Sequence, residues 1–179
     1  MIKEKSPLVG VIMGSDSDLP IMRHASETLV DFDVPHENRI VSAHRTPERM
    51  ALYARNAKDR GLKAIIAGAG GSAHLQGMTA SETILPVMGV SIGSDKDPLM
   101  AAVGSQIKMH EGKQIAYIGE GKKGAVNAAL YAVRILALSD PELSQAYYDY
   151  IQNMSNGVDK KDRQLASKGP ASYLADREL

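Results

Sequence analysis

The hydrophobic positions along the chain predict five strands. Leu8 to Met13 is a continuous apolar run that ends at Gly14, and such runs are typical of strands covered on both faces. The other predicted strands lie at residues 36–41, 64–67, 87–92 and 114–118. Each is followed by a segment of different character.

Apolar residues at helical spacing occupy most of the segments between these strands. Ile21, Met22, Ala25 and Leu29 recur at intervals of three and four residues, which predicts a helix over 19–32. Further helices are predicted at 47–60, where Gly61 ends the helix, at 97–107 and at 125–138. The last of these is apolar nearly all round, which predicts burial on every side.

Strands that alternate with helices at this spacing indicate right-handed βαβ units. The fold class is therefore α/β, with a parallel sheet covered by helices on both faces. Ligands of such sheets bind beyond the carboxyl ends of the strands, near the topological switch point. Three loops then converge: GSDSD (14–18), SAHRTP (42–47) and GAGGSAH (68–74).

The C-terminal segment has a different composition. Ser139, Asp140, Pro141 and Glu142 have the pattern of a capping box with proline in the first turn, and predict a helix to about residue 154. We therefore expect a single α/β domain over residues 1–154. Residues 155–179 are polar and charged, and are either a mobile tail or an arm that packs on a neighbouring subunit.

Composition and charge exclude several classes of function. The 179 residues suit one domain, and 44% are hydrophobic. Lys plus Arg equals Asp plus Glu at 21 each, so no global field favours nucleic acid or an anionic membrane. There is no cysteine for disulfides or thiolate–zinc sites, no apolar run long enough to span a membrane, and no signal-peptide pattern. These features predict a cytoplasmic protein.

The GSDSD loop has two interpretations. A glycine after a strand lets backbone N–H groups face an anion, and Ser15 and Ser17 add hydroxyl groups. The segment can equally be a plain helix start, capped by Asp16 or Asp18. No further carboxylates accompany the two aspartates, so we expect no metal site.

SAHRTP raises the same question. Thr46 and Pro47 are an ordinary helix start, but a cap needs neither His44 nor Arg45. Arginine offers a two-pronged fork for phosphate, and imidazole is suited to proton transfer near neutral pH. On the residues alone, a structural role and a functional role are about equally supported.

GAGGSA matches the glycine pattern of a dinucleotide-binding loop. That pattern belongs between the first strand and its helix, whereas here it follows the third strand and runs into HLQGM with no clear helix start. We therefore expect no nicotinamide cofactor, and instead close approach of this loop to another planar or phosphorylated ligand.

Together these loops resemble one known family. The segments VIMGSDSD, VSAHRTPE, IIAGAGGSAHLQGM and GKKGAVNAALYAVRIL are similar to the class I members of the PurE family, the N5-carboxyaminoimidazole ribonucleotide mutases of purine biosynthesis. The resemblance covers about residues 9–154. It implies a flavodoxin-like three-layer α/β/α subunit in a homo-octamer, with C-terminal helices packed on neighbouring subunits, and a small ribonucleotide substrate with no cofactor or metal.

The resemblance also implies roles for individual residues. His44 is the general acid and base, Arg45 holds the phosphate, and Ser15 and Asp18 contact the ribose or its phosphate. The loop carrying Gly70, Gly71, Ser72 and His74 closes over the imidazole ring. Ser42, Leu75 and Met109 complete the expected substrate-binding set.

The chain departs from the family pattern beside the expected imidazole pocket. Gln76 replaces the usual proline of HLPGM, and the loops at 93–104 and 109–114 differ, with His110 and Glu111 where an apolar wall is usual. Three hypotheses follow. The chain is a mutase, a divergent paralogue that carboxylates or decarboxylates a related heterocyclic ribonucleotide, or a non-catalytic ribonucleotide-binding oligomer.

Overall fold

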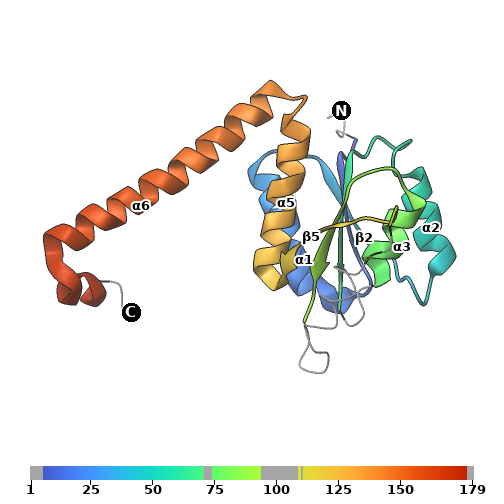
Figure 1. Ribbon diagram of the computed structural model, residues 1–179, viewed down its shortest axis with the longest axis horizontal. Coiled ribbons are helices and arrows are strands. Elements are labelled where there is room, and N and C mark those ends of the chain that lie inside the picture. The colour runs from blue at the N-terminus through green and yellow to red at the C-terminus, as the bar shows by residue number, and fades with distance from the viewer. Residues whose placement is uncertain (1–5, 71–73, 94–108, 110, 177–179) are drawn as a thin grey trace, which may run out of the picture. The chain divides into compact units, whose positions relative to one another are not determined.

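The chain divides into two units, and a parallel sheet forms the centre of the first, which ends at Leu136 (Figure 1). The structure is a computed structural model and describes residues 6–70, 74–93, 109 and 111–176. Within these residues the sheet has five strands in the order β2-β1-β3-β4-β5. The strands are β1 (Val9–Met13), β2 (His36–Ile40), β3 (Ala64–Ala69), β4 (Val87–Ser91) and β5 (Ala116–Glu120).

Helices cover both faces of this sheet, as the sequence predicts. Figure 1 shows α1 (Leu19–Asp31) and α5 (Gly121–Ala137) on one face, and α2 (Pro47–Asn56) and α3 (His74–Glu82) on the other. This strand order with parallel pairing is that of flavodoxin-like folds. The three-layer α/β/α architecture is therefore confirmed.

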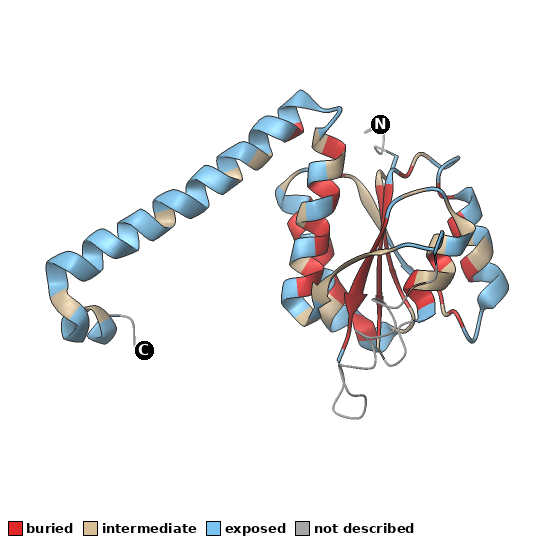
Figure 2. Cartoon of the chain, viewed as in Figure 1, coloured by how far each residue is buried: buried red, intermediate tan, exposed pale blue. Residues whose placement is uncertain are grey.

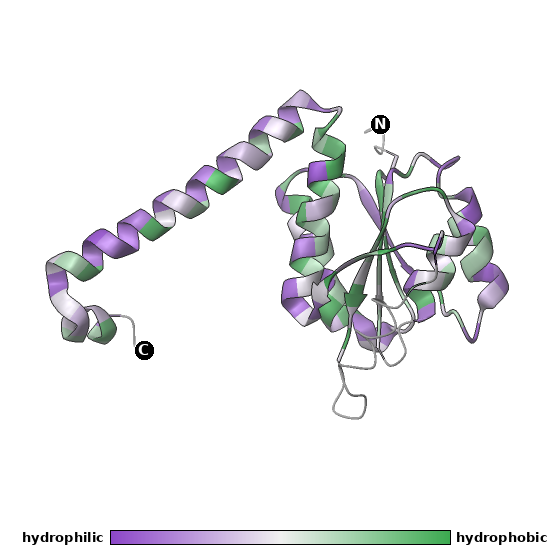
Figure 3. Ribbon diagram, in the orientation of Figure 1, coloured by the Kyte–Doolittle hydropathy of each residue, from purple (hydrophilic) through white to green (hydrophobic). Residues whose placement is uncertain are grey.

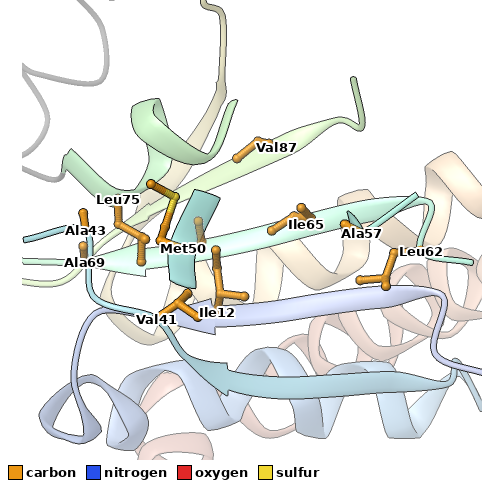
Figure 4. Close-up of a cluster of buried hydrophobic side chains, with 11 residues drawn as sticks. Ile12, Val41, Ala43, Met50, Ala57, Leu62, Ile65, Ala69, Leu75 and Val87 are labelled. Carbon is orange, nitrogen blue, oxygen red and sulfur yellow. The ribbon is translucent and has the colours of Figure 1, made fainter. Parts of the chain in front are cut away.

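The inner strands are buried along their whole length (Figure 2). Side chains of β3 alternate between the faces of the sheet, as strand geometry requires. Ile65, Ala67 and Ala69 join a buried cluster with side chains of α2 and α3 (Figure 4). On the opposite face Gly68 lies against Met22 of α1, because a Cβ at Gly68 would come within 2.1 Å of the Met22 sulfur.

The edge strand β2 is polar and largely exposed. Ion pairs tie it to its surroundings: Glu37 lies 2.7 Å from Arg60 Nη1 and 3.2 Å from Arg39 Nε. Burial alone would raise the pKa of Glu37, but the neighbouring Tyr53 hydroxyl and the two guanidinium groups outweigh it and lower this pKa.

Close backbone packing joins β5 to α5. A Cβ at Gly124 would lie 2.5 Å from the Gly119 carbonyl carbon, so only glycine fits at Gly124. Gly119 itself has a φ of 149°, which other residues rarely adopt. The buried residues of α5 form one face, and Asn127, Tyr131 and Arg134 are exposed in this chain. One side of α5 is thus exposed in the single chain, and its predicted burial on every side, which needs a neighbouring subunit, stays a prediction.

Several predicted element boundaries are wrong. The helix predicted to reach residue 60 ends at Asn56, because residues 57–61 form turns that close on Gly61 with its positive φ of 98°. The segment HLQGM, predicted to be a loop, starts α3. The strand predicted at 114–118 instead begins two residues later, at Ala116, and ends at Glu120. The helix predicted at 97–107 lies outside the described residues.

The C-terminal unit consists mainly of α6 (Pro141–Ala175). Asp140 caps it by accepting hydrogen bonds from the amides of Glu142 and Leu143, both at 3.1 Å. The predicted end near residue 154 is wrong, since helical structure continues to Ala175 with one break at Gly169. Polar and apolar positions alternate along it (Figure 3). No helix in the described part of the chain is long and apolar enough to cross a membrane.

Candidate active site

The three loops singled out from the sequence follow three neighbouring strands. β2, β1 and β3 are adjacent, and Met13 at the end of β1 pairs with Ile40 on one side and Gly68 on the other. The carboxyl ends of these strands therefore lie side by side. The predicted convergence of the loops at one edge of the sheet is confirmed.

The loop after β1 is a short 3-10 turn, Asp16–Asp18, capped by Ser15. The Ser15 hydroxyl accepts a hydrogen bond from the Ser17 amide at 3.3 Å, and the Asp18 carboxylate accepts one from the Ser15 amide at 3.0 Å. These two bonds form a capping box. Ser15, rather than Asp16 or Asp18, is thus the residue whose side chain caps this turn.

The two aspartates of this loop have different electrostatic environments. Asp16 is exposed, and the hydrogen bond from the Ser15 hydroxyl lowers the pKa of its carboxyl group. Asp18 is buried, and this burial raises the pKa of its carboxyl group despite hydrogen bonds from the backbone amides of Ser15 and Gly14. The ionised Asp18 carboxylate therefore lowers the free energy of unfolding, because its charge is buried.

We expect Asp18→Asn to preserve or increase the free energy of unfolding at pH 7. The amide oxygen can still accept the Ser15 N–H, and the cost of burying a charge disappears. Because the folded-state pKa of Asp18 is raised, this advantage of the variant is present at neutral pH and is lost as the pH falls through that raised pKa and the Asp18 carboxyl group becomes protonated. Urea denaturation at several pH values measures it.

Asp16→Asn is the matched control, since the pKa of Asp16 is shifted in the opposite direction and its replacement brings no gain in stability. A marked loss of stability in Asp18→Asn at pH 7 would contradict this view of Asp18.

The turn after β2 is braced by Ser42 and Thr46. The Thr46 hydroxyl accepts from the Ser42 amide and donates to the Ser42 carbonyl, both at 3.1 Å. The Ser42 hydroxyl accepts from the Arg45 amide at 3.2 Å. Ser42 therefore fixes the backbone of the turn that carries His44 and Arg45, and its predicted contact with substrate stays a prediction.

Arg45 links this turn to the loop after β1. Its Nη2 donates to the Gly14 carbonyl oxygen at 3.3 Å. Its charge contributes to the lowered pKa of Asp16 and opposes in part the rise in the pKa of Asp18 that burial causes. The side chain is exposed. A guanidinium group carries five donors, so most of them remain for an anion at the start of the first helix.

His44 meets His74, which is the first residue of α3. His44 Nε2 and His74 Nδ1 are 2.8 Å apart, and both side chains are exposed. Each histidine is next to a residue of the buried cluster, namely Ala43 and Leu75 (Figure 4). The core therefore fixes the two backbone positions that bring the imidazole rings together.

The remaining predicted site residues differ in how the structure places them. Gly70 packs against the Ile92 carbonyl, since a Cβ there would lie 2.8 Å from that oxygen. Leu75 is buried in the core cluster, and its predicted contact with substrate stays a prediction. Met109 lies against Gly77 of α3. Gly71, Ser72 and His110 are outside the described residues.

Gln76, which replaces the usual family proline, is fully buried. Its Nε2 donates to the Val90 carbonyl of β4 at 3.0 Å, and its Oε1 has no protein partner among the described residues. The glutamine thus connects α3 to the sheet. No cluster of three or more potential metal ligands occurs within the described ranges.

Two contributors to this site are missing from the sequence-based set. Thr46 braces the turn, and the Gly14 carbonyl holds Arg45. The spacing of Ser42 and Thr46, four residues apart across the turn, is a signal that could identify the first. A backbone carbonyl has no sequence signal.

Comparisons with known proteins extend over nearly the whole chain. The model of the AIR carboxylase family matches residues 8–157. The chain is 45% identical over 175 residues to the N5-carboxyaminoimidazole ribonucleotide mutase of Pyrococcus horikoshii, covering 98% of each chain. It is 46% identical over 159 residues to the same-named protein of Bacillus subtilis, covering 89% of this chain and 98% of the other.

Solved structures give the same result. The crystal structure of Treponema denticola PurE matches with a TM-score of 0.79 and 28% sequence identity, covering 89% of this chain and 98% of that chain. The residues that the family model matches, 8–157, include the five strands and the three loops at the carboxyl edge of the sheet.

Proposed function

The chain belongs to the AIR carboxylase family, and from this premise we propose that it moves the carboxyl group of N5-carboxyaminoimidazole ribonucleotide from N5 to C4 of the imidazole ring, a step of purine biosynthesis. The observation that carries the proposal is the placement of His44 and Arg45 on one turn at the carboxyl edge of the sheet, with Arg45 bound to the neighbouring loop. Arg45 can then bind the phosphate of one substrate molecule while His44 reaches its imidazole ring.

The phosphate end of the substrate is assigned to Arg45 and the loop after β1. The guanidinium group binds the phosphate dianion, and Ser15 contacts the same group or the ribose. Asp18 accepts a hydrogen bond from a ribose hydroxyl. This assignment is supported by the cation that Arg45 places near the start of the first helix, where the helix dipole also favours an anion.

The ring end is assigned to His44. In the proposed reaction His44 gives a proton to N5, the N5–carboxyl bond breaks, and carbon dioxide is released into the site. The C4 carbon then attacks the trapped carbon dioxide, and His44 removes the C4 proton. One imidazole serves both transfers because it can act as acid and then as base near neutral pH. Exclusion of water by the loop after β3 prevents escape of the intermediate.

The departures at 93–104 and 109–114 lie largely outside the described residues. Identity of 45% over nearly the full length of a protein named as a mutase supports mutase activity over the paralogue hypothesis. The same identity supports catalysis over the hypothesis of a non-catalytic ribonucleotide-binding oligomer.

Incubation of the purified protein with N5-carboxyaminoimidazole ribonucleotide tests the proposal. We expect the C4-carboxylated isomer to form well above the spontaneous rate. A rate equal to the spontaneous one would exclude the mutase function, and tight binding without turnover would instead support the non-catalytic hypothesis.

We also propose that the chain assembles as a homo-octamer through α6. Ile151, Val158 and Leu165 recur at seven-residue intervals and are 42%, 62% and 40% exposed in the single chain. An exposed apolar stripe on a long helix is typical of a helix that packs on another subunit.

Sedimentation equilibrium is expected to give a mass eight times the 19.2 kDa of the chain. Val158→Asp places a charge in the stripe and is expected to reduce this mass, whereas Asn153→Asp, an exposed position away from the stripe, leaves it unchanged. An unaltered octamer in the Val158 variant would contradict assembly through this face.

A further inference from the structure

The contact between His44 and His74 is a direct hydrogen bond in the planes of both rings. The nitrogen atoms are 2.8 Å apart, and the ring centroids are 5.1 Å apart with an interplanar angle of 85°. The centroids are farther apart than the nitrogens by about one ring diameter. The bond therefore lies along the line that joins the ring centres, as an in-plane N–H···N bond requires, and the rings are not stacked.

This bond restricts where protons can lie on the two rings. If His44 Nε2–H donates to His74 Nδ1, both neutral rings carry their proton on Nε2. If His74 Nδ1–H donates to His44 Nε2, both carry it on Nδ1. Two neutral rings joined in this way must therefore have the same tautomer.

The other nitrogen of His44 remains available for chemistry. Nδ1 of His44 has no hydrogen-bond partner among the residues that the structure describes, and the side chain is exposed at the carboxyl edge of the sheet. His44 thus has one nitrogen towards His74 and one towards the position of a substrate. A proton that arrives at Nδ1 can leave through Nε2.

We propose that His74 is the proton partner of His44, and that the two imidazoles together store the proton that the reaction moves. The inference rests on the proposed function, since it assigns to His74 the proton that His44 exchanges with the substrate. His74 acts through His44, so it is a positioning residue rather than a residue that contacts the reacting atoms.

The pair begins the reaction with one extra proton, with Nδ1–H on His44 and both nitrogens of His74 protonated. His44 Nδ1 gives its proton to N5 of the substrate, while the Nδ1–H bond of His74 breaks and an Nε2–H bond forms on His44. Both rings are then neutral, and both carry a proton on Nε2.

The last step reverses these transfers. The C4–H bond of the substrate breaks, its electron pair returns to the ring, and an Nδ1–H bond forms on His44. At the same time the Nε2–H bond of His44 breaks and an Nδ1–H bond forms on His74. The positive charge ends on His74, His44 stays neutral, and the pair regains the proton that it gave to N5.

Two substitutions of His74 separate proton transfer from hydrogen bonding. In His74→Asn the amide lies where Nδ1 was and can still form a hydrogen bond with His44, but it cannot take up a proton. In His74→Leu both properties are lost. We expect kcat to fall about ten- to hundredfold in both variants, because neither side chain can exchange a proton with His44, with KM changed less than about twofold.

His24→Asn is the matched control, because His24 lies on α1 and binds Glu27 at 2.7 Å. We expect its kcat to equal that of the unaltered protein. If His74→Asn retains full kcat, His74 does not store a proton and the proposal is wrong. A rise in KM with unchanged kcat would likewise overturn it, in favour of direct substrate binding.

A spectroscopic measurement tests the pair without relying on turnover. Long-range proton–nitrogen correlation spectra of the protein labelled with 15N-histidine report the tautomer of each ring. We expect His44 and His74 to show the same tautomer when both rings are neutral. In His74→Leu we expect the tautomer of His44 to change, while the other histidines keep theirs. Opposite tautomers would exclude the hydrogen bond and the proposal with it. Absence of mutase turnover in the unaltered protein would refute the proposed function, and the spectra would still decide on the pair.

Discussion

The His44→Asn variant is expected to lose about 10²- to 10⁴-fold in kcat, the usual contribution of a general acid–base group. Asparagine can still form a hydrogen bond with His74 but cannot exchange a proton with N5 or C4. Since Arg45 and its bond to Gly14 are unaffected, KM should change little. Steady-state kinetics of the mutase reaction measures both constants.

His24→Asn is the control for this variant too, because it removes an imidazole from a helix outside the three loops. A His44→Asn enzyme with kcat within about threefold of the unaltered protein would show that another group transfers the protons. The expected loss is a reduction in kcat and kcat/KM together, which is the mark of an interaction made in the transition state.

Arg45→Met is expected to lower kcat/KM by about a hundredfold, mainly through a higher KM. Methionine keeps an apolar stem of similar length but removes the fork that pairs with phosphate, and a charge-assisted bond of this kind contributes roughly 2–3 kcal/mol. It also removes the donor to the Gly14 carbonyl. Calorimetric titration with ribose 5-phosphate, which lacks the reacting ring, should show the same loss of affinity.

Arg49→Met provides the control for net charge. Arg49 is exposed on α2, the same helix that follows the turn carrying Arg45. We expect this variant to bind ribose 5-phosphate as the unaltered protein does. Equal losses in the two variants would mean that the effect is one of general charge, and equal affinity in Arg45→Met would remove Arg45 from the phosphate site.

Much of the sheet could be predicted from the sequence because its signals are local. Val9 to Met13 and Ala64 to Ala69 are apolar without interruption, as strands buried on both faces are. Parallel pairing of such strands places the loops at 14–18, 42–47 and 68–74 at one edge. This topological argument is sufficient to predict that His44, Arg45 and Ser15 lie near one another.

Two helices were less accessible to prediction, for different physical reasons. α3 buries Leu75, Gln76 and Thr79 on one side, and two of these are polar, so its buried side does not stand out as an apolar stripe. Its Gly77, which lies against Met109, also has low helix propensity. The second half of α6 is mostly polar, and its apolar residues Val158 and Leu165 are seven positions apart. Apolar residues this far apart do not give the three- and four-residue spacing that predicts a helix.

The contact between His44 and His74 could not be predicted from the sequence. The residues are thirty positions apart, and their strands β2 and β3 are separated in the sheet by β1. Only the packing of Ala43 and Leu75 into one buried cluster brings them to hydrogen-bonding distance. Side-chain packing of this kind depends on three-dimensional fit rather than on a local pattern.

The central claim is that the carboxyl group moves within one substrate molecule. The most direct test uses N5-carboxyaminoimidazole ribonucleotide labelled with 13C in its carboxyl group, incubated with the protein in unlabelled bicarbonate buffer under single-turnover conditions. Mass spectrometry of the C4-carboxylated product is expected to show retention of most of the label, because the released carbon dioxide stays in the site. Product whose carboxyl group carries the isotopic composition of the buffer would contradict the account and identify direct carboxylation from solution.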